Sequence, residues 1–190
     1  VIRRFSRRWK LIWRNIAFYK MHKLIILRGN SGSGKTSAAK ALQNRFGPNT
    51  MLISHDMIRM QILHVSGAEG ILRSQPLMID LLKYGRVHSE ITILEGILPA
   101  EDYRLLFETA VSEFGSDIFA YYYDLPFEET LRRHSTKPNR NDFGEADMRR
   151  WWREKDFLPM IRETVLHQDI SLADAVDLIY GQVTGSAADG

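Results

Sequence analysis

Residues 29–36 read Gly29-Asn30-Ser31-Gly32-Ser33-Gly34-Lys35-Thr36 and directly follow the apolar run Leu24-Ile25-Ile26-Leu27. Their spacing, G-x-x-x-x-G-K-[S/T], is the Walker A pattern of a phosphate-binding loop, and it lies here between a predicted strand and a predicted helix. Glycines suit this loop because the backbone must turn through positive φ and bring N–H groups close to phosphate oxygens. We therefore predict that the loop, with Ser37 just after it, binds ATP or GTP.

Two side chains of the pattern have separate expected roles. Lys35 can reach the β- and γ-phosphates, and the Thr36 hydroxyl can ligate Mg²⁺. The helix that begins there turns its positive end toward the bound anion. The sequence therefore predicts both a nucleotide site and a magnesium ligand at one turn of the chain.

Composition excludes several other kinds of chemistry. A chain of 190 residues with 44% hydrophobic and 26% charged residues is typical of one globular domain. It contains no Cys, which excludes disulfides, thiolate metal sites and cysteine nucleophiles. The apolar runs are much shorter than the roughly 20 residues of a membrane span, and no signal peptide is visible. We expect a cytoplasmic protein without a membrane span.

The net charge of +3 is unevenly distributed. Residues 1–20 hold seven of the 26 basic residues and no acid, so residues 21–190 carry 19 basic and 23 acidic groups, a net charge of −4. The first 20 residues also place apolar side chains at helical spacing, which fits an amphipathic membrane-surface or partner-binding helix. We favour a different interpretation, a basic N-terminal extension that is not part of the native domain or is loosely attached to it.

Apolar runs alternate with helical patterns along the rest of the chain. This order predicts an α/β fold in which a five-stranded parallel sheet carries helices on both faces. The predicted strands cover 24–27, 51–54, 91–94, 118–123 and 164–166. The predicted helices cover 37–45, 57–65, 72–86, 101–114, a segment opened by Asp124-Leu125-Pro126, 146–155 and 172–180, and residues 184–190 are expected to fray. Gly67 and Gly70 should separate the second and third of these helices, and Asp124 is the candidate cap of the fifth, with Pro126 in its first turn.

Two acidic residues follow predicted strands and should meet beside the loop. Asp56 comes after the second strand and Glu95 ends the third, and the carboxyl ends of parallel strands share one edge of the sheet. Asp56 is our candidate general base for phosphoryl transfer to a hydroxyl, with a helix N-cap as its structural alternative. Glu95 is expected to hold a Mg²⁺-bound water or to contact the acceptor, with a structural turn carboxylate as its alternative.

Residues 132–155 are rich in arginine and lie where a kinase lid would close. A lid excludes water and brings guanidinium groups to the transferring phosphoryl group. Most of these cations fit a solvated helix with charge pairs, so only a few are candidates. Arg133 and Arg140 are the leading ones, with Arg132 and Arg149 behind them.

Two other features near these candidates are less specific. Trp151-Trp152 could stack on a base or a sugar, but aromatic residues beside a lid more often pack it down. Of the six His, only His55 is a candidate substrate contact, because it adjoins Asp56.

From Met21 to about Val183 the chain resembles the small P-loop kinases that include polynucleotide 5′-hydroxyl kinase and the zeta toxins. The resemblance is carried by Ser54-His55-Asp56-Met57-Ile58-Arg59, by Leu131-Arg132-Arg133-His134 and by Met148-Arg149-Arg150-Trp151. It implies a P-loop NTPase fold of the nucleoside and nucleotide kinase type with a short lid. It also implies Asp56 as the base, Arg59 as a contact to the acceptor or its phosphate, and Arg133 or Arg140 on the nucleotide phosphates.

The leading functional hypothesis is an ATP- and Mg²⁺-dependent kinase that phosphorylates a hydroxyl of a small molecule such as a nucleoside, a sugar or an antibiotic. A zeta-toxin-like or nucleic-acid 5′-kinase is the second hypothesis, and the mildly acidic body of the chain disfavours a polynucleotide acceptor. A nucleotide-dependent switch is the alternative from another class, and the Asn-Lys-x-Asp signature for guanine is absent. The run Leu94-Glu95-Gly96-Ile97-Leu98 is also similar to uridine kinase-like enzymes, so the acceptor stays open, as do the choice of ATP or GTP and the oligomeric state.

Overall fold

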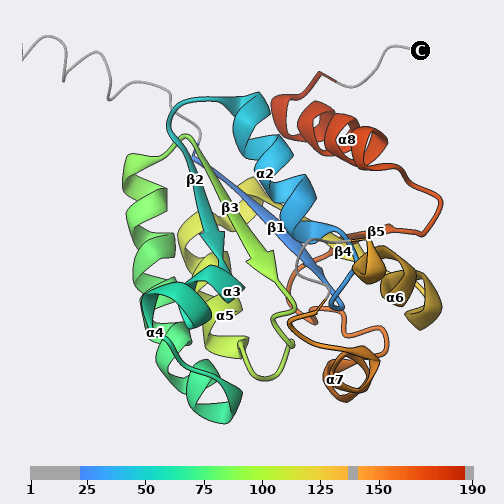
Figure 1. Ribbon diagram of the computed structural model, residues 1–190. Coiled ribbons are helices and arrows are strands. Elements are labelled where there is room, and N and C mark those ends of the chain that lie inside the picture. Colours follow the sequence, from blue (N-terminus) through green and yellow to red (C-terminus); the bar gives the residue numbers. More distant parts are fainter. Residues whose placement is uncertain (1–21, 137–140, 187–190) are drawn as a thin grey trace, which may run out of the picture.

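The computed structural model describes residues 22–136 and 141–186. Its centre is a parallel sheet with the strand order β2-β3-β1-β4-β5 (Figure 1). The strands are β1 (Lys23–Gly29), β2 (Thr50–Ser54), β3 (Ile91–Gly96), β4 (Ile118–Tyr123) and β5 (Glu163–Leu166). The main helices are α2 (Lys35–Phe46), α4 (Gly67–His88), α5 (Arg104–Phe114), α6 (Phe127–Ser135), α7 (Glu145–Trp151) and α8 (Leu172–Thr184). The predicted α/β class with five parallel strands is confirmed.

The central strand β1 shows why helices cover both faces of the sheet. Successive strand residues point to opposite faces. Leu24 and Ile26 pack into one core with residues of α4 and α5, whereas Ile25 and Leu27 pack into a second core with residues of α2 and α8. All four side chains are fully buried. An uninterrupted apolar run is therefore required here, because neither face of the strand meets water.

The strand register brings the candidate residues to one edge of the sheet. Gly29, the last residue of β1, pairs with Tyr123 of β4. Glu95 of β3 pairs with Leu27 on one side and with Ser54 of β2 on the other. The phosphate loop, the end of β2 and the end of β3 thus lie next to each other at the carboxyl edge.

The segment after β2 differs from the prediction. The expected helix 57–65 is a short α3 (His55–Met57) followed by a π-helix, η1 (Ile58–Ile62). Gly67 and Gly70 were expected to separate two helices, but both belong to α4, which also contains Pro76. The physical reason at Gly70 is close packing, since a Cβ there would lie 2.6 Å from Nε of Arg59.

Two predictions at the lid were also wrong. Asp124 does not cap α6; Pro126 holds the N-cap position, while the backbone N–H of Asp124 donates to Leu166 O and extends the pairing of β4 with β5. Helix α7 ends at Trp151 rather than near Lys155. The chain leaves the helix because the Asn30 side chain hydrogen-bonds both the N–H and the carbonyl of Arg153.

The ends of the chain bear on three earlier expectations. Residues 1–20, the expected extension, lie outside the described part of the chain. Helix α8 continues through Thr184, beyond the predicted end at 180, and residues 187–190 of the expected frayed tail also lie outside. Within 22–136 and 141–186, none of the helices combines the length and the apolar composition of a membrane span.

Candidate active site

The phosphate loop connects β1 to α2, and its shape depends on glycine. Gly29, Gly32 and Gly34 have φ angles of 136°, 82° and 105°, which side chains rarely permit. A Cβ on Gly32 would lie 2.4 Å from the carbonyl oxygen of Thr130 in α6. The glycines therefore allow both the turn and the close seating of the loop against α6.

Lys35 and Thr36 begin helix α2 directly after the loop. The Lys35 ammonium donates to Asn30 O over 2.8 Å and to Ser33 Oγ over 3.3 Å, so it lies across the loop that it follows. Thr36 Oγ1 donates to Glu95 Oε2 over 3.1 Å. Ser37 is exposed in the first turn of the helix. A cation and a hydroxyl group are thus held at the mouth of the loop.

Glu95 is buried where three elements meet. Its side chain accepts a hydrogen bond from Ser54 Oγ over 2.5 Å as well as from Thr36 Oγ1, and the residue is 2% exposed. Carboxylate and hydroxyl oxygens are suitable donors toward Mg²⁺. The described residues contain no cluster of three or more His, Cys, Asp or Glu side chains for a metal. The residues Thr36 and Glu95 are therefore of a kind that fits Mg²⁺, with Thr36 as a ligand and Glu95 as a partner of a Mg²⁺-bound water.

Asp56 belongs to α3 and Arg59 to η1, the two short helices that follow β2, whose last residue Ser54 pairs with Glu95. The Asp56 side chain is 74% exposed, and the N-cap position of α3 belongs to Ser54, so the capping alternative for Asp56 is wrong. Arg59 donates one long hydrogen bond, from Nη2 to Gly67 O over 3.5 Å, and its buried Nε has no hydrogen-bond partner. A carboxylate open to solvent therefore lies one turn before a guanidinium group whose Nε is buried without a hydrogen-bond partner.

His55 lies beneath this surface. The residue is 3% exposed, and its Nε2 is 2.5 Å from Tyr103 Oη, which in turn is 3.2 Å from Ser74 Oγ. Burial lowers the pKa of His55 to about 4, and the nearby Asp56 carboxylate opposes that shift. Burial also raises the pKa of Tyr103. Sequence inspection selected His55 but not Tyr103 or Ser74, because no local pattern links positions this far apart.

Among the lid arginines that the structure describes, Arg133 has a side chain that hydrogen-bonds the phosphate loop. Its Nη1 donates to Ser33 O over 3.1 Å and its Nη2 to Gln168 O over 3.0 Å. Arg132 is 68% exposed and pairs with Glu129, and Arg149 pairs with Glu145 on α7. Arg140 lies outside the described residues.

The two tryptophans of the lid make packing contacts. Trp152 meets the Phe127 ring edge-on, with a centroid distance of 5.2 Å. Trp151 meets Phe143 in the same way and at the same distance. These contacts agree with the packing interpretation of the pair.

Arg28 was missed by the sequence analysis. It precedes the loop and is fully buried, with hydrogen bonds to Leu98 O, Asp156 and Glu163. Burial raises the pKa of Glu163, and the Arg28 charge opposes that rise. Arg28 thus joins the loop after β3 to the segment after the lid helix. An arginine beside an apolar strand gave no indication of this role.

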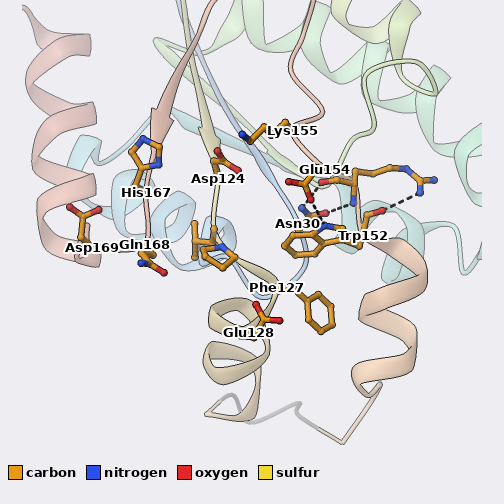
Figure 2. A pocket seen from close by; sticks show the side chains of 13 residues that line it. Asn30, Asp124, Phe127, Glu128, Trp152, Glu154, Lys155, His167, Gln168 and Asp169 are labelled. Carbon is orange, nitrogen blue, oxygen red and sulfur yellow. Dashed lines mark hydrogen bonds between the residues drawn. The ribbon is translucent and has the colours of Figure 1, made fainter.

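A cavity of about 620 Å³ lies at the carboxyl ends of β4 and β5. His167, Gln168 and Asp169 lie on one side of it, and Trp152, Glu154 and Asn30 on the other (Figure 2). It shares only Asn30 with the candidate site residues. Its lining includes the four carboxylates Asp124, Glu128, Glu154 and Asp169 and the two cations Arg153 and Lys155, so acidic groups outnumber basic ones.

Comparison with known proteins adds support at the level of the fold. No known family profile and no curated protein sequence matches the chain. Among solved structures, the chain is similar to the Mycobacterium tuberculosis APS kinase CysC in complex with AMPPNP and APS (TM-score 0.60, 18% identity, 85% of this chain and 97% of that one). It is also similar to a gluconokinase from Sinorhizobium meliloti (TM-score 0.59, 16% identity, 89% of this chain and 95% of that one). A third similar structure is shikimate kinase from Aquifex aeolicus (TM-score 0.52, 17% identity, 88% of this chain and 99% of that one). The chain thus has the α/β fold of the P-loop kinases.

Proposed function

We propose that this chain is an ATP-dependent kinase that uses Mg²⁺ and transfers the γ-phosphoryl group to a hydroxyl of a small acceptor molecule. The observation that carries the proposal is the meeting of three groups at one edge of the sheet. Thr36 Oγ1 lies 3.1 Å from the buried Glu95 carboxylate, and Asp56 follows Ser54, the other partner of that carboxylate. A nucleotide-dependent switch would need the loop and the metal ligand but no carboxylate open to an acceptor.

Each residue has one task in this reaction. Lys35 and the loop backbone bind the phosphates, while Thr36 directly and Glu95 through water would hold the cation. When bound there, Mg²⁺ would supply positive charge to the phosphate oxygens. Asp56 accepts the proton of the attacking hydroxyl, and Arg133 with Arg140 stabilises the transferring group.

The Asp-x-x-Arg spacing also suggests the subfamily and the acceptor class. We place the chain with the small kinases related to polynucleotide kinase and the zeta toxins, because Asp56 and Arg59 stand at that spacing after β2. The Arg59 guanidinium group makes one long and exposed hydrogen bond, from Nη2 to Gly67 O, and its charge would attract a polar or anionic group of the acceptor. Two of the structures with this fold are named for the small hydroxyl compounds gluconate and shikimate. The mildly acidic body of the chain disfavours a polynucleotide acceptor.

The test is a screen of ADP release with nucleosides, sugars, aminoglycosides and 5′-hydroxyl oligonucleotides. With the best acceptor, Asp56→Asn should lower kcat by about 10²–10⁴-fold, the usual contribution of a general base. Lys35→Ala should lower kcat/KM by at least about 10²-fold, because it removes a cation from the transferring phosphates.

Matched controls for these variants come from the same chain. Asp117→Asn changes a carboxylate just before β4, at the opposite edge of the sheet, and Lys40→Ala changes an exposed lysine of α2. Both should keep transfer within about twofold, as expected of surface positions. Wild-type transfer by Asp56→Asn would refute the assigned base, and a fully active Lys35→Ala protein would refute the kinase mechanism.

A further inference from the structure

The buried residue His55 stands directly before the candidate base. The His55 Nδ1 atom lies 3.6 Å from Asp56 Oδ1, too far for a hydrogen bond, and this buried nitrogen has no other partner. Its Nε2 is bonded to Tyr103, which belongs to the segment just before α5. Tyr103 is bonded in turn to Ser74 of α4. Three buried side chains, Ser74, Tyr103 and His55, are therefore joined by hydrogen bonds and lead to within 3.6 Å of the Asp56 carboxylate.

The imidazole ring of His55 is tightly packed. The ring meets Tyr103 edge-on, with 5.0 Å between centroids and an interplanar angle of 83°. Gly96, the last residue of β3, leaves the necessary room, since a Cβ there would lie 2.6 Å from the Cβ of His55. A ring enclosed in this way has little freedom to rotate, so the direction of Nδ1 is set by the packing.

The groups around the His55 ring determine which of its two nitrogens carries the proton. A neutral imidazole carries one N–H, and the nitrogen that carries it is selected by the neighbouring groups. The Asp56 carboxylate faces Nδ1 and favours a proton there, which leaves Nε2 to accept the Tyr103 O–H. Tyr103 Oη can then accept from the Ser74 hydroxyl, whose other acceptor, Ile71 O, is more distant at 3.4 Å than Tyr103 Oη at 3.2 Å. In this arrangement the donors of Ser74, Tyr103 and His55 all point toward Asp56.

We propose that His55 is a positioning residue whose Nδ1–H orients the Asp56 carboxylate, and that Tyr103 and Ser74 fix this donor. The inference rests on the proposed role of Asp56 as the general base. The exposed carboxylate is 3.6 Å from Nδ1 in the free protein, and it closes to hydrogen-bond distance when an acceptor displaces water from it. Helix α4 and the segment just before α5 thereby contribute to catalysis without touching the reacting atoms.

The first experiment measures the tautomer of His55 in the full chain. Long-range ¹H–¹⁵N correlation spectra distinguish Nδ1–H from Nε2–H, and the His55 signals are identified by their loss in His55→Gln. The expected result at pH 7 is a neutral ring with the proton on Nδ1. An Nε2–H tautomer or a protonated ring would overturn the proposal, and this outcome does not depend on knowing the acceptor.

The second experiment separates positioning from general stability. Tyr103→Phe should lower kcat by about 10–100-fold, as seen for outer partners of catalytic groups, with the KM for ATP within about twofold. Tyr121→Phe is the matched control, because it removes another buried hydroxyl, one bonded to Gln182 on the far side of the sheet. It should leave kcat within about twofold.

Two substitutions of His55 distinguish its nitrogens. The amide of His55→Asn can occupy the place of Nδ1, whereas the amide of His55→Gln reaches only the place of Nε2. His55→Asn should therefore retain at least about tenfold more kcat than His55→Gln. Equal kcat values for the two, or a wild-type kcat for Tyr103→Phe while Asp56→Asn is inactive, would sink the inference and leave the proposed function standing. Transfer that survives Asp56→Asn would instead remove the proposed base itself.

Discussion

Thr36 Oγ1 donates a hydrogen bond to Glu95 Oε2 over 3.1 Å and so joins the first turn of α2 to the end of β3. The two residues are 59 positions apart in the chain, and each follows or ends a strand of the same sheet. The contact brings the hydroxyl of the phosphate-loop motif together with a buried carboxylate. The first prediction follows from this pair.

Replacing Glu95 should weaken the response to Mg²⁺. Glu95→Gln keeps the shape of the side chain but removes its charge, so the Mg²⁺ concentration at half-maximal binding of a fluorescent ADP should rise by about 10–100-fold. Ser54→Ala removes a hydrogen bond to the same carboxylate and keeps the charge, so its shift should be smaller. An unchanged Mg²⁺ response in Glu95→Gln would show that Glu95 is a structural carboxylate.

Arg133 should contribute to nucleotide affinity. Both Arg133 and its neighbour Arg132 pair with Glu129, but the Arg133 guanidinium group also donates to Ser33 O within the loop, whereas the Arg132 side chain is 68% exposed. Arg133→Ala should weaken ADP binding by about tenfold or more, the effect of losing one charge-assisted hydrogen bond. Titration calorimetry measures the change, and Arg132→Ala is the control with an affinity close to wild type. Equal effects of the two variants would contradict the assignment.

Arg28 should be essential for stability. Arg28→Met leaves the Glu163 side chain, which is 1% exposed, without its cation, and breaking such a buried pair typically costs about 3–5 kcal/mol. Urea unfolding at pH 8 measures the loss. Arg45→Met breaks the exposed pair with Asp177 and should cost less than about 1 kcal/mol.

The loss of stability caused by Arg28→Met should depend on pH in a defined direction. Burial raises the pKa of Glu163 in the folded protein, so the folded state binds its proton more tightly than the unfolded state. Without Arg28 the pKa of Glu163 in the folded protein rises further. The stability of the variant is then retained at low pH and lost as pH increases through that pKa. The cost of Arg28→Met should therefore be smaller at pH 5 than at pH 8. Equal costs at both pH values would exclude Glu163 as the partner that matters.

His55 should make the protein sensitive to mild acid. Its pKa falls from 6.5 to about 4 on burial, with Asp56 opposing the shift and Arg59 and Lys35 adding to it. The pKa of His55 is lower in the folded protein than in the unfolded protein, so the neutral ring contributes its full stabilisation above pH 6.5. This contribution to the free energy of unfolding is lost as pH falls toward 4, by up to about 3 kcal/mol. His55→Asn should flatten the pH dependence of urea unfolding between pH 7 and 4. A wild-type slope in that variant would contradict the neutral buried ring.

Local patterns predicted most of the fold. The runs around Leu24, Ile93 and Ala120 are apolar because both faces of these strands are buried, so period and hydrophobicity were sufficient to place them. The order of strands and helices then indicated a parallel sheet. The errors occurred at the π-helix η1, at the glycines of α4 and at the end of α7, where contacts with distant residues such as Arg59 and Asn30 override local preference.

The candidate site divides in the same way. The sequence by itself determined the phosphate loop, since glycine spacing, Lys35 and Thr36 are local requirements of a backbone that wraps a phosphate. It also placed Asp56 and Glu95 after strands, and hence at one edge. Only the tertiary structure decided that Arg133 meets the loop, that Glu95 accepts from Ser54 and Thr36, and that Tyr103 lies behind His55. Those contacts join residues far apart in the chain, and their partners are selected by packing in three dimensions, which no local pattern records.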